Sequence, residues 1–171
     1  MDTVKLVRKS KKGNNTAFST LIKGYEKDLY KVAIAMTKND DDALDCIQEA
    51  ILQAYISIKD LRQDEYFKTW LIKILINKCN ALIKKNKKIL NLDIKITEDE
   101  KVEQSDKLEL KQSINNLDSD LKIIVILYYY EDMSIKDISE SLNVPQGTIK
   151  SRLSRARIKL KEMLSIEEEL L

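Results

Sequence analysis

Apolar residues recur every three or four positions through most of the chain, the spacing that places side chains on one face of an α-helix. The predicted helices span residues 3–12, 15–36, 43–59, 66–88, 107–116, 119–130, 134–142 and 145–164. Gly13 suits the left-handed position that ends the first helix, and the Asp40–Asp42 run can begin the third. With only three glycines and one proline, the chain has little material for hairpin turns. We therefore expect an all-α fold.

The periodic pattern weakens over residues 89–106, where acidic side chains dominate. Residues 1–88 carry a net charge of +7, from 18 Lys and Arg against 11 Asp and Glu. Residues 89–120 carry −5, from 4 against 9, and residues 121–164 carry +3, from 8 against 5. Two basic segments separated by an acidic one indicate two modules that face one polyanion, joined by a linker that avoids it. On charge alone, a charged linker between two ordinary helical domains remains open.

No stretch of the sequence is suited to a membrane. The longest apolar run, IIVILYYY, has eight residues, well short of the ~18 that cross a bilayer as a helix. The N-terminal residues are charged and lack the apolar core of a secretion signal. Cys46 and Cys79 are too far apart in sequence for a CxxC motif, and we expect both to stay reduced in a cytoplasmic protein.

The residues that most enzymes use are missing from the sequence. There is no histidine, which removes the commonest general base and the commonest zinc ligand. Neither a GxGxxG nor a GxxxxGKS/T phosphate loop is present, nor a GxSxG nucleophile elbow. The carboxylates are scattered among lysines, which is more typical of solvated helix faces than of a catalytic pair. We expect a binding protein with no catalytic residue, no metal site and no cofactor.

The stretch SIKDISESLNVPQGTIKSRLSRARIKL, residues 134–160, predicts two helices joined by a short turn. Ser134 and Asp137 resemble a capping box at the start of the first helix, and Asn143 is a suitable left-handed residue to end it. Pro145 fixes the backbone at the start of the second helix, where its missing N–H costs nothing. A three-residue turn followed by a basic helix is the geometry of a helix-turn-helix.

The second of these helices divides into two faces. Ile149, Leu153, Ala156 and Leu160 lie within about 60° of one another, at ~100° per residue, and predict the buried face. The other face combines short hydroxyls, which allow close approach to base edges, with long cations that bind guanine or phosphate. A basic solvated helix within a bundle is the other interpretation. The predicted DNA contacts are Gln146, Thr148, Lys150, Ser151, Arg152, Ser154, Arg155 and Lys159.

Residues 117–164, above all GTIKSRLSRARIKL, resemble the C-terminal domain of bacterial extracytoplasmic-function sigma factors. The segments DDALDCIQEAILQAYISI and YFKTWLIKILINKCNALIKKNKK resemble two successive parts of the same family's N-terminal domain. Together with the C-terminal segment they cover nearly all of residues 3–164 apart from the connector. The resemblance implies two helical domains: a sigma region 2-like domain over residues 1–88, a flexible acidic linker over 89–112, and a region 4-like helix-turn-helix domain over 113–171.

In that family the first domain binds core RNA polymerase and the −10 promoter element, and the second binds the −35 element. The resemblance therefore implies a sigma factor that directs promoter-specific transcription initiation and is not an enzyme. Its implied partners are core RNA polymerase (the clamp helices of the largest subunit, and the flap), promoter DNA and an anti-sigma factor. A stand-alone helix-turn-helix regulator that binds duplex DNA is the alternative.

The helix from Ala43 to Ile58 has apolar residues on two sides. The residues that share the predicted core face are Ile47, Ile51, Ala54 and Ile58. On the far side, apolar residues amid polar ones indicate either a partner surface or a face covered by another helix of the same domain. The pattern alone leaves both open. The resemblance implies that this surface docks on the polymerase clamp helices, through Asp45, Gln48, Glu49, Leu52 and Ile56.

The helix over residues 66–88 is apolar around much of its circumference, so we expect it to be largely enclosed. One polar stripe recurs at three- and four-residue steps: Lys73, Asn77, Asn80, Lys84 and Lys88. Such a stripe suits a nucleic acid strand, and a plain solvated face is the other interpretation. The resemblance implies that this helix engages the −10 element and that the loop 60–66 before it receives a flipped base. The predicted −10 contacts are Arg62, Lys73, Asn77, Asn80 and Lys84.

Two places depart from the family's usual pattern. Ala81 stands where the family usually has Asp, and Lys84 and Lys85 replace the more usual Arg. Lys keeps the charge but loses bidentate geometry, so phosphate contact survives better than specific pairing.

Three further features have a plain structural interpretation beside a functional one. Trp70 is either a wedge that opens the duplex or a core residue, and its apolar neighbours favour the core. Cys46 and Cys79 are expected to be small buried hydrophobic residues rather than a redox pair. The tyrosines at 128–130 follow IIVIL on one helix, which favours packing over base stacking.

Overall fold

The computed structural model of the chain describes residues 2–90 and 108–168. This part consists of helices and the turns between them, without a strand, so the predicted all-α fold is confirmed. The chain divides into two compact units, Met1–Asn86 and Lys87–Leu171. Residues 91–106 of the predicted connector lie outside the described residues.

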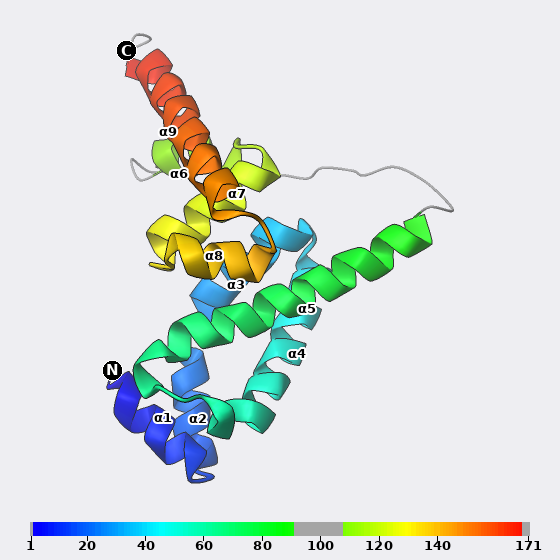
Figure 1. Cartoon of the computed structure of the whole chain (residues 1–171), viewed down its shortest axis with the longest axis vertical. Helices are drawn as coiled ribbons and strands as arrows, with labels where there is room; N and C mark the ends of the chain where they lie inside the picture. The colour runs from blue at the N-terminus through cyan, green and yellow to red at the C-terminus, as the bar shows by residue number, and fades with distance from the viewer. Residues whose placement is uncertain (1, 91–107, 169–171) are drawn as a thin grey trace. The chain divides into compact units, whose positions relative to one another are not determined.

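The N-terminal unit begins with short helices and ends with a long one (Figure 1). Its elements are α1 (Thr3–Lys11), α2 (Asn15–Lys23), α3 (Glu26–Thr37), α4 (Asp40–Ser57), the 3-10 turns η1 (Ile58–Asp60) and η2 (Asp64–Tyr66), and α5 (Phe67–Leu90). Asparagine side chains cap two of these helices: Asn14 accepts from the N–H of Ala17 at 2.8 Å, and Asn39 accepts from that of Asp42 at 2.9 Å. Each cap satisfies an N–H that has no partner within its own helix.

The continuous helix predicted over residues 15–36 is wrong, because the structure divides it into α2 and α3 at Gly24 and Tyr25. Tyr25 leaves the helical conformation, with φ −116° and ψ 2°. The preceding glycine makes a break here inexpensive, since glycine costs a helix interior about 1 kcal/mol relative to alanine. The Tyr25 ring packs against Phe67 with 5.7 Å between ring centres. Helical periodicity continues across the break, so the pattern did not reveal it.

The core face of α4 agrees with the predicted one only in part: Ala54 is buried, as is Ile58 directly after the helix. Ile47 and Ile51 are only half-buried, whereas the fully buried positions are Ala43, Cys46, Ala50 and Ala54. These small residues recur every three or four positions and let α3 and α5 approach α4 closely. The thiols of Cys46 and Cys79 influence one another's pKa where α4 meets α5, and both residues are buried and free of disulfides, as expected. Size rather than hydrophobicity decides which face of α4 is buried.

Helix α5 supplies the largest side chains of the N-terminal core. Its fully buried residues are Phe67, Leu71, Ile72, Leu75, Ile76 and Cys79. Trp70 is half-buried and packs against the ring of Phe67, 5.8 Å away. Beyond Cys79, the apolar residues Leu82 and Ile83 are only half-buried, so the predicted enclosure holds for the first half of α5 and not for the second.

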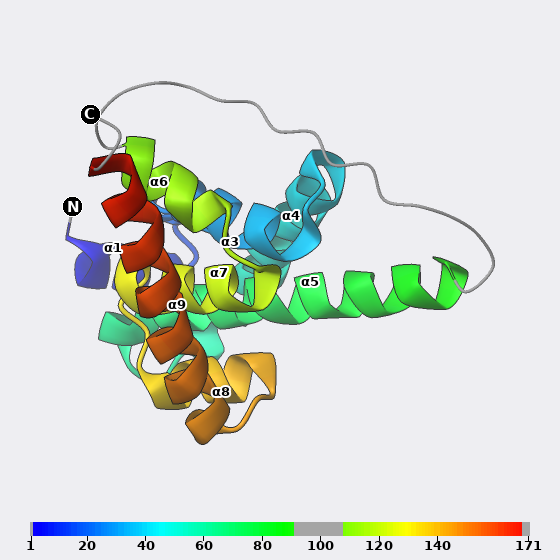
Figure 2. The same ribbon diagram turned by 90° about the horizontal axis from the view of Figure 1, so that it is seen from above.

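The C-terminal unit packs shorter helices around one long helix. Its elements are α6 (Leu108–Asn115), α7 (Ser119–Val125), the π-helical turn η3 (Ile126–Tyr130), α8 (Ile135–Leu142) and α9 (Gln146–Glu168). Figures 1 and 2 both show α9 lying beside α6 and α7. One cluster of buried side chains joins these three helices: Ile114, Leu117, Leu121, Val125 and Ala156, with Leu160 packed against it.

The predicted helix-turn-helix is present. Ser134 caps α8 by accepting from the N–H of Asp137 at 3.0 Å, and its hydroxyl donates to the Asp137 carboxylate at 2.6 Å. Asn143 ends α8 in the left-handed conformation, with φ 54° and ψ 46°. The N–H of Val144 closes the turn on the carbonyl of Ser139 at 3.0 Å, and α9 begins after Pro145. The turn residues therefore do what their chemistry predicts.

Candidate nucleic-acid and polymerase interfaces

Helix α9 presents two different faces. The predicted apolar stripe is buried: Ile149 and Ala156 are fully enclosed, Leu153 nearly so, and Leu160 partly. On the other side the side chains of Gln146, Lys150, Ser151, Ser154 and Arg155 are exposed, while Thr148 is half-buried. The hydroxyl of Ser151 donates to the carbonyl of Thr148 at 2.9 Å, which keeps it close to the helix. The polar face therefore consists of short side chains that stay close to the helix backbone, with longer cationic side chains on both sides of them.

Two cations predicted to contact DNA are bound to carboxylates at the start of α7. Arg152 lies 2.8 Å from Asp120, and Lys159 lies 2.6 Å from Asp118. These ion pairs join α9 to α7, and Lys159 lowers the pKa of Asp118 through its hydrogen bond and its charge. Lys150 and Arg155 are further exposed cations on the polar face, and neither forms an ion pair with a carboxylate among the described residues. The polar face therefore contains two classes of cation, one engaged within the protein and one directed to solvent.

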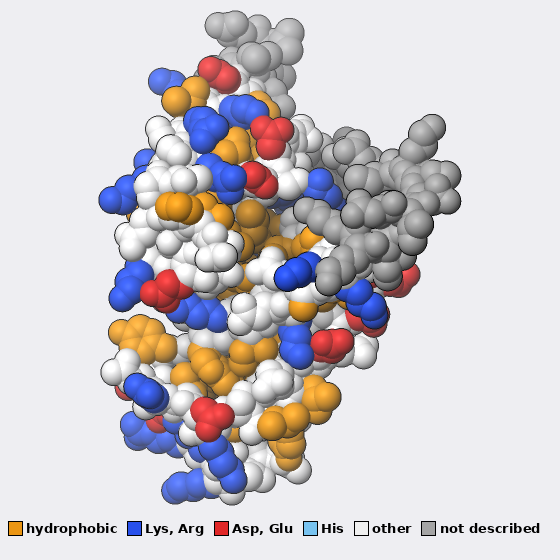
Figure 3. Space-filling view, turned by 45° about the vertical axis from the view of Figure 1, so that its right-hand side comes forward, with side chains coloured by type: hydrophobic (Ala, Val, Ile, Leu, Met, Phe, Trp, Pro, Cys, Tyr) orange, Lys and Arg blue, Asp and Glu red, His pale blue; other side chains and the backbone are white. Residues whose placement is uncertain are grey.

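The outward face of α4 is polar and apolar at once. Leu52 and Ile56 are 60% and 66% exposed, beside the exposed side chains of Asp45, Gln48 and Glu49. The interpretation in which another helix of the same unit covers these two residues is therefore excluded. Glu49 also lies 3.4 Å from Lys78 on α5. Figure 3 shows such surface hydrophobic side chains (orange) between charged ones on one face of the molecule.

The predicted polar stripe of α5 is accessible in part. Asn77, Asn80 and Lys84 are exposed along one side of the helix, and Lys73 is half-buried. Arg62 is exposed in the loop between η1 and η2. The side chain of Lys88 lies outside the described residues. The structure thus places three of the predicted −10 contacts in one row on α5 and Arg62 on the loop that precedes it.

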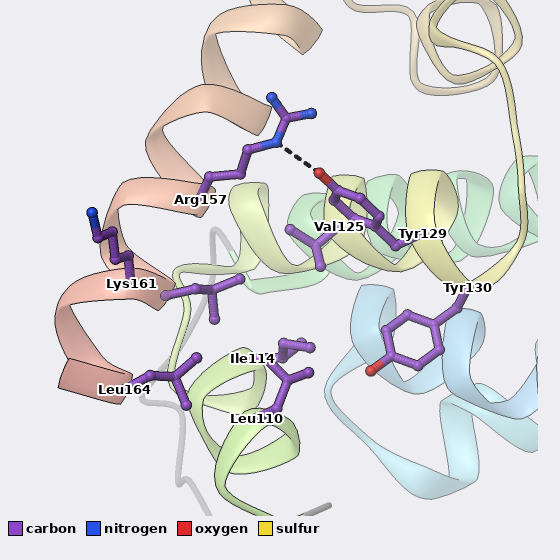
Figure 4. Close-up of a pocket in the computed structure, with 9 residues that line it drawn as sticks. Leu110, Ile114, Val125, Tyr129, Tyr130, Arg157, Lys161 and Leu164 are labelled. Carbon is purple, nitrogen blue, oxygen red and sulfur yellow. Dashed lines mark hydrogen bonds between the residues drawn. The ribbon is translucent and has the colours of Figure 1, made fainter. Parts of the chain in front are cut away.

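Sequence reasoning missed a groove on the C-terminal unit. It has a volume of about 720 Å³ and opens between α6, η3 and α9 (Figure 4). Leu110, Ile114 and Leu164 contribute apolar surface, and Arg157 donates from Nε to the hydroxyl of Tyr129 at 2.7 Å. Tyr129 and Tyr130 line the groove and remain about half-exposed, while Tyr128 is half-buried and packs edge-on against Tyr129, so the predicted packing role accounts for only part of their surface. The π-helical turn that redirects Tyr129 and Tyr130 left no clear signal in the sequence.

Two classes of site can be checked directly in the part of the chain that the structure describes. None of its helices is long and apolar enough to cross a membrane. Within residues 2–90 and 108–168, no cluster of three or more His, Cys, Asp or Glu side chains is arranged to hold a metal ion. The candidate functional surfaces are the polar faces of α4, α5 and α9 and the groove between α6, η3 and α9.

Comparison with known proteins connects these surfaces. The family model described as "Sigma-70 region 2" matches residues 21–89, and the one described as "Sigma-70, region 4" matches residues 107–160. RNA polymerase sigma factor SigV of Bacillus subtilis is 32% identical over 165 residues, which cover 95% of this chain and 99% of that protein. The ECF RNA polymerase sigma-E factor of Haemophilus influenzae is 32% identical over 172 residues, 89% of each chain.

The chain belongs to the extracytoplasmic-function sigma factors. As a member of that family it is a promoter-specific transcription initiation factor that binds RNA polymerase and DNA. The ECF RNA polymerase sigma factor SigW of Bacillus subtilis, 29% identical over 178 residues, covers 94% of the chain. The resemblance found in the sequence is thereby confirmed, and the helix-turn-helix belongs to the part that matches region 4.

Two solved structures share the fold. CnrH, solved in complex with the cytosolic domain of CnrY, has a TM-score of 0.63 at 21% identity and covers 96% of this chain and 97% of its own. The sigma factor RpoE of Bartonella quintana, solved in complex with the anti-sigma factor NepR, has a TM-score of 0.64 at 26% identity and covers 81% and 90%. Both comparisons include each of the two helical units.

Proposed function

We propose that this sigma factor fastens to core RNA polymerase through the outward face of α4. The observation that carries the proposal is the exposure of Leu52 and Ile56, 60% and 66%, among Asp45, Gln48 and Glu49. Apolar side chains of this size gain free energy when a partner removes them from water, and the surrounding polar groups fix the partner's orientation. The clamp helices of the largest polymerase subunit are the partner that membership of the family implies.

The polar face of α9 is proposed to read the −35 element in the major groove. The short side chains of Ser151 and Ser154 let base edges come close to the helix backbone. The longer side chains of Lys150 and Arg155 flank them and extend outward. The remaining proposed contacts on this helix are Gln146, Thr148, Arg152 and Lys159. Arg152 and Lys159 would exchange their carboxylate partners for phosphate when DNA binds.

The exposed row on α5 is proposed to follow a strand of the −10 element. Amides at Asn77 and Asn80 can hydrogen-bond to bases, and Lys84 can hold phosphate. Lys73 and Arg62 would extend this contact in the direction of the loop 60–66, where the family implies that a flipped base is received. Such a row of cations and amides suits an unpaired strand, because its contacts with phosphates and single bases can form without the groove of an intact duplex.

The groove between α6, η3 and α9 is proposed as the seat of the polymerase flap. Its lining is mainly apolar, with Arg157 and the tyrosine hydroxyls as polar groups that can orient a partner. Because it lies on the C-terminal unit, a contact here would hold that unit on the polymerase near the −35 element. This contact and the α4 contact would then be made by different domains.

These proposed contacts assign a function to each domain and suggest a partner that regulates the protein. Residues 1–88 would bind core polymerase and the −10 element, residues 89–112 would connect, and residues 113–171 would bind the −35 element. The protein would act in the cytoplasm as a binding factor rather than an enzyme. Since the sigma factor RpoE, which shares the fold, was solved in complex with the anti-sigma factor NepR, we include an anti-sigma factor among its partners.

Reconstitution tests the proposal. Core RNA polymerase that lacks its own sigma factor should capture the purified chain and gain selective initiation from it on genomic DNA, with start sites that share one −10 and one −35 sequence. A stand-alone helix-turn-helix regulator would instead bind duplex DNA tightly without polymerase. Failure of core polymerase both to capture the chain and to initiate selectively would contradict the proposed function.

A further inference from the structure

Two cations of α1 hold the loop over residues 61–66, which runs from the end of η1 through the turn η2. Lys11 Nζ donates to Oδ1 of Asp64 at 2.5 Å and to the carbonyl oxygen of Leu61 at 2.6 Å. Arg8 Nε donates to the other carboxylate oxygen of Asp64 at 3.0 Å. The Asp64 side chain is 14% exposed, and Lys11 and Arg8 lower its pKa. Three hydrogen bonds from one helix thus converge on one short loop.

The same loop is anchored at both ends by apolar side chains. Leu61 and Phe67 are buried, so they fix the loop to the core before and after Asp64. The four residues between these anchor points, Arg62, Gln63, Glu65 and Tyr66, are exposed, and Tyr66 is 60% exposed. Three inward anchors therefore force the intervening side chains outward. The backbone bond from the Tyr66 N–H to the Gln63 carbonyl at 3.2 Å shapes the turn locally, and the anchors set where the loop lies on the unit.

We infer that Arg8, Lys11 and Asp64 form a clamp through which α1 sets the conformation of the loop 61–66 and thereby the selectivity for the −10 element. This inference rests on the proposed function, in which that loop and the row on α5 contact the promoter. Arg8, Lys11 and Asp64 are positioning residues, because their side chains bind the loop rather than DNA. Tyr66 and Gln63 are the exposed side chains whose placement the clamp controls.

The position of α1 in the sequence supports a separate role for the clamp. The match to region 2 begins at residue 21, so α1 lies before it and reaches the loop across more than 50 residues of sequence, with 56 between Arg8 and Asp64. Helix α1 is itself fixed to the unit by buried Val7 and by the contact of Thr3 Oγ1 with the Tyr25 hydroxyl at 3.3 Å. A fixed helix with two directed cations can restrain a loop, whereas a mobile chain end cannot.

Selectivity measured with reconstituted holoenzyme tests the clamp. The readout is the initiation rate on a cognate promoter divided by the rate on promoters with single-base changes in the −10 element. We expect Asp64→Asn and Lys11→Gln each to lower this ratio about fivefold, the size expected from losing one charge-assisted hydrogen bond at a partly exposed site. Core binding and selectivity for the −35 element should stay unchanged. Lys11→Arg should keep most of the ratio, and Lys9→Gln, on the exposed side of α1, should keep all of it.

Two further variants make the result specific. The double variant Lys11→Gln/Asp64→Asn should lower the ratio by less than the product of the two single effects, because both changes remove the Lys11–Asp64 ion pair. If Asp64→Asn fails to fold, Arg8→Gln and Lys11→Gln test the same clamp, because they remove its hydrogen bonds by changing side chains of α1 instead. If the ratio falls with Arg62→Ala but stays unchanged in all clamp variants, the inferred role of the clamp is wrong, whereas the proposed role of the loop stands. A ratio insensitive to Arg62→Ala and to Tyr66→Ala contradicts the proposed function of the loop itself, and the clamp's role with it.

Discussion

Lys159 on the polar face of α9 donates from Nζ to Oδ2 of Asp118 across 2.6 Å, and so ties the proposed recognition helix to the start of α7. The next ion pair, Arg152 with Asp120 at 2.8 Å, makes the same connection. Both carboxylates are largely exposed, so each pair adds little stability in water. These ion pairs instead affect DNA binding, because DNA phosphates must compete with Asp118 and Asp120 for Lys159 and Arg152.

Removing that competition should strengthen DNA binding. We expect Asp118→Asn to raise the affinity of holoenzyme for promoter DNA severalfold at low salt and to steepen the salt dependence by about one phosphate contact. Fluorescence anisotropy over a range of KCl concentrations measures both. In the Lys159→Gln background the same change should leave the salt dependence unaltered. If it steepened there too, the effect would be one of net charge rather than of the freed lysine.

The exposed cations of α9 should act on promoter recognition alone. We predict that Arg155→Ala and Lys150→Ala each weaken initiation from the −35-dependent promoter about tenfold, the usual cost of one base or phosphate contact. Binding to core polymerase, measured by co-purification, should not change. Lys23→Ala removes one exposed cation from the N-terminal unit and serves as the charge-matched control. Loss of core binding in the α9 variants would contradict the division between the two units.

The α4 surface should behave in the opposite way. Ile56→Asp should lower core polymerase affinity by about two orders of magnitude, because it places an unpaired charge in the middle of an apolar contact. Since Ile56 is already exposed to water, the thermal unfolding midpoint should move little. Thr20→Asp adds the same charge at an exposed site on α2 and should leave polymerase binding intact. An Ile56→Asp protein that bound core polymerase normally would remove α4 from the interface.

The Asp64 clamp should make stability depend on pH in a defined window. Lys11 and Arg8 hold the pKa of Asp64 below its ordinary value, so the carboxylate stabilises the fold above the unfolded-state pKa, about 3.9. As pH falls through the lower folded-state pKa, that contribution is lost. The difference in unfolding midpoint between wild type and Asp64→Asn should therefore be present at pH 6 and vanish in strong acid. A difference independent of pH would mean that the carboxylate charge is unimportant.

The two cysteines should be unreactive while the protein is folded. Burial raises the pKa of both thiols, so little thiolate is present near neutral pH. We expect alkylation by iodoacetamide to proceed at the rate of unfolding and to accelerate in denaturant. Mass spectrometry of timed samples follows the modification of Cys46 and Cys79 separately. Rapid labelling in native buffer would show that the contact between α4 and α5 opens readily.

Local signals in the sequence were sufficient where one residue type satisfies one backbone requirement. Ser134, Asn143 and Pro145 mark the helix-turn-helix, and each occupies the predicted role in the structure. The stripe from Ile149 to Leu160 was likewise predictable, because α9 packs along a single line of neighbours and a period of 3.6 residues identifies that line. These features rest on interactions within a few residues of one another.

The outcome on α4 could not be read in the same way. Ile47 and Ile51 are the more hydrophobic choice, yet the close approach of neighbouring helices selects the face of Ala43, Cys46 and Ala50. Whether Leu52 and Ile56 were covered also depended on where the other helices run. Helical period identifies faces, but the distance between two helices determines which face fits.

The sequence by itself determined the helical class, the helix-turn-helix and the family, because these depend on periodicity, on capping chemistry and on motifs that are local in the chain. Only the tertiary structure decided that α1 reaches the loop at Asp64, that Lys159 and Arg152 are held by α7, and that η3 opens a groove beside α9. Each of these joins residues far apart in sequence or depends on how helices pack. Such contacts are set by the packing of the core, and no local pattern encodes them.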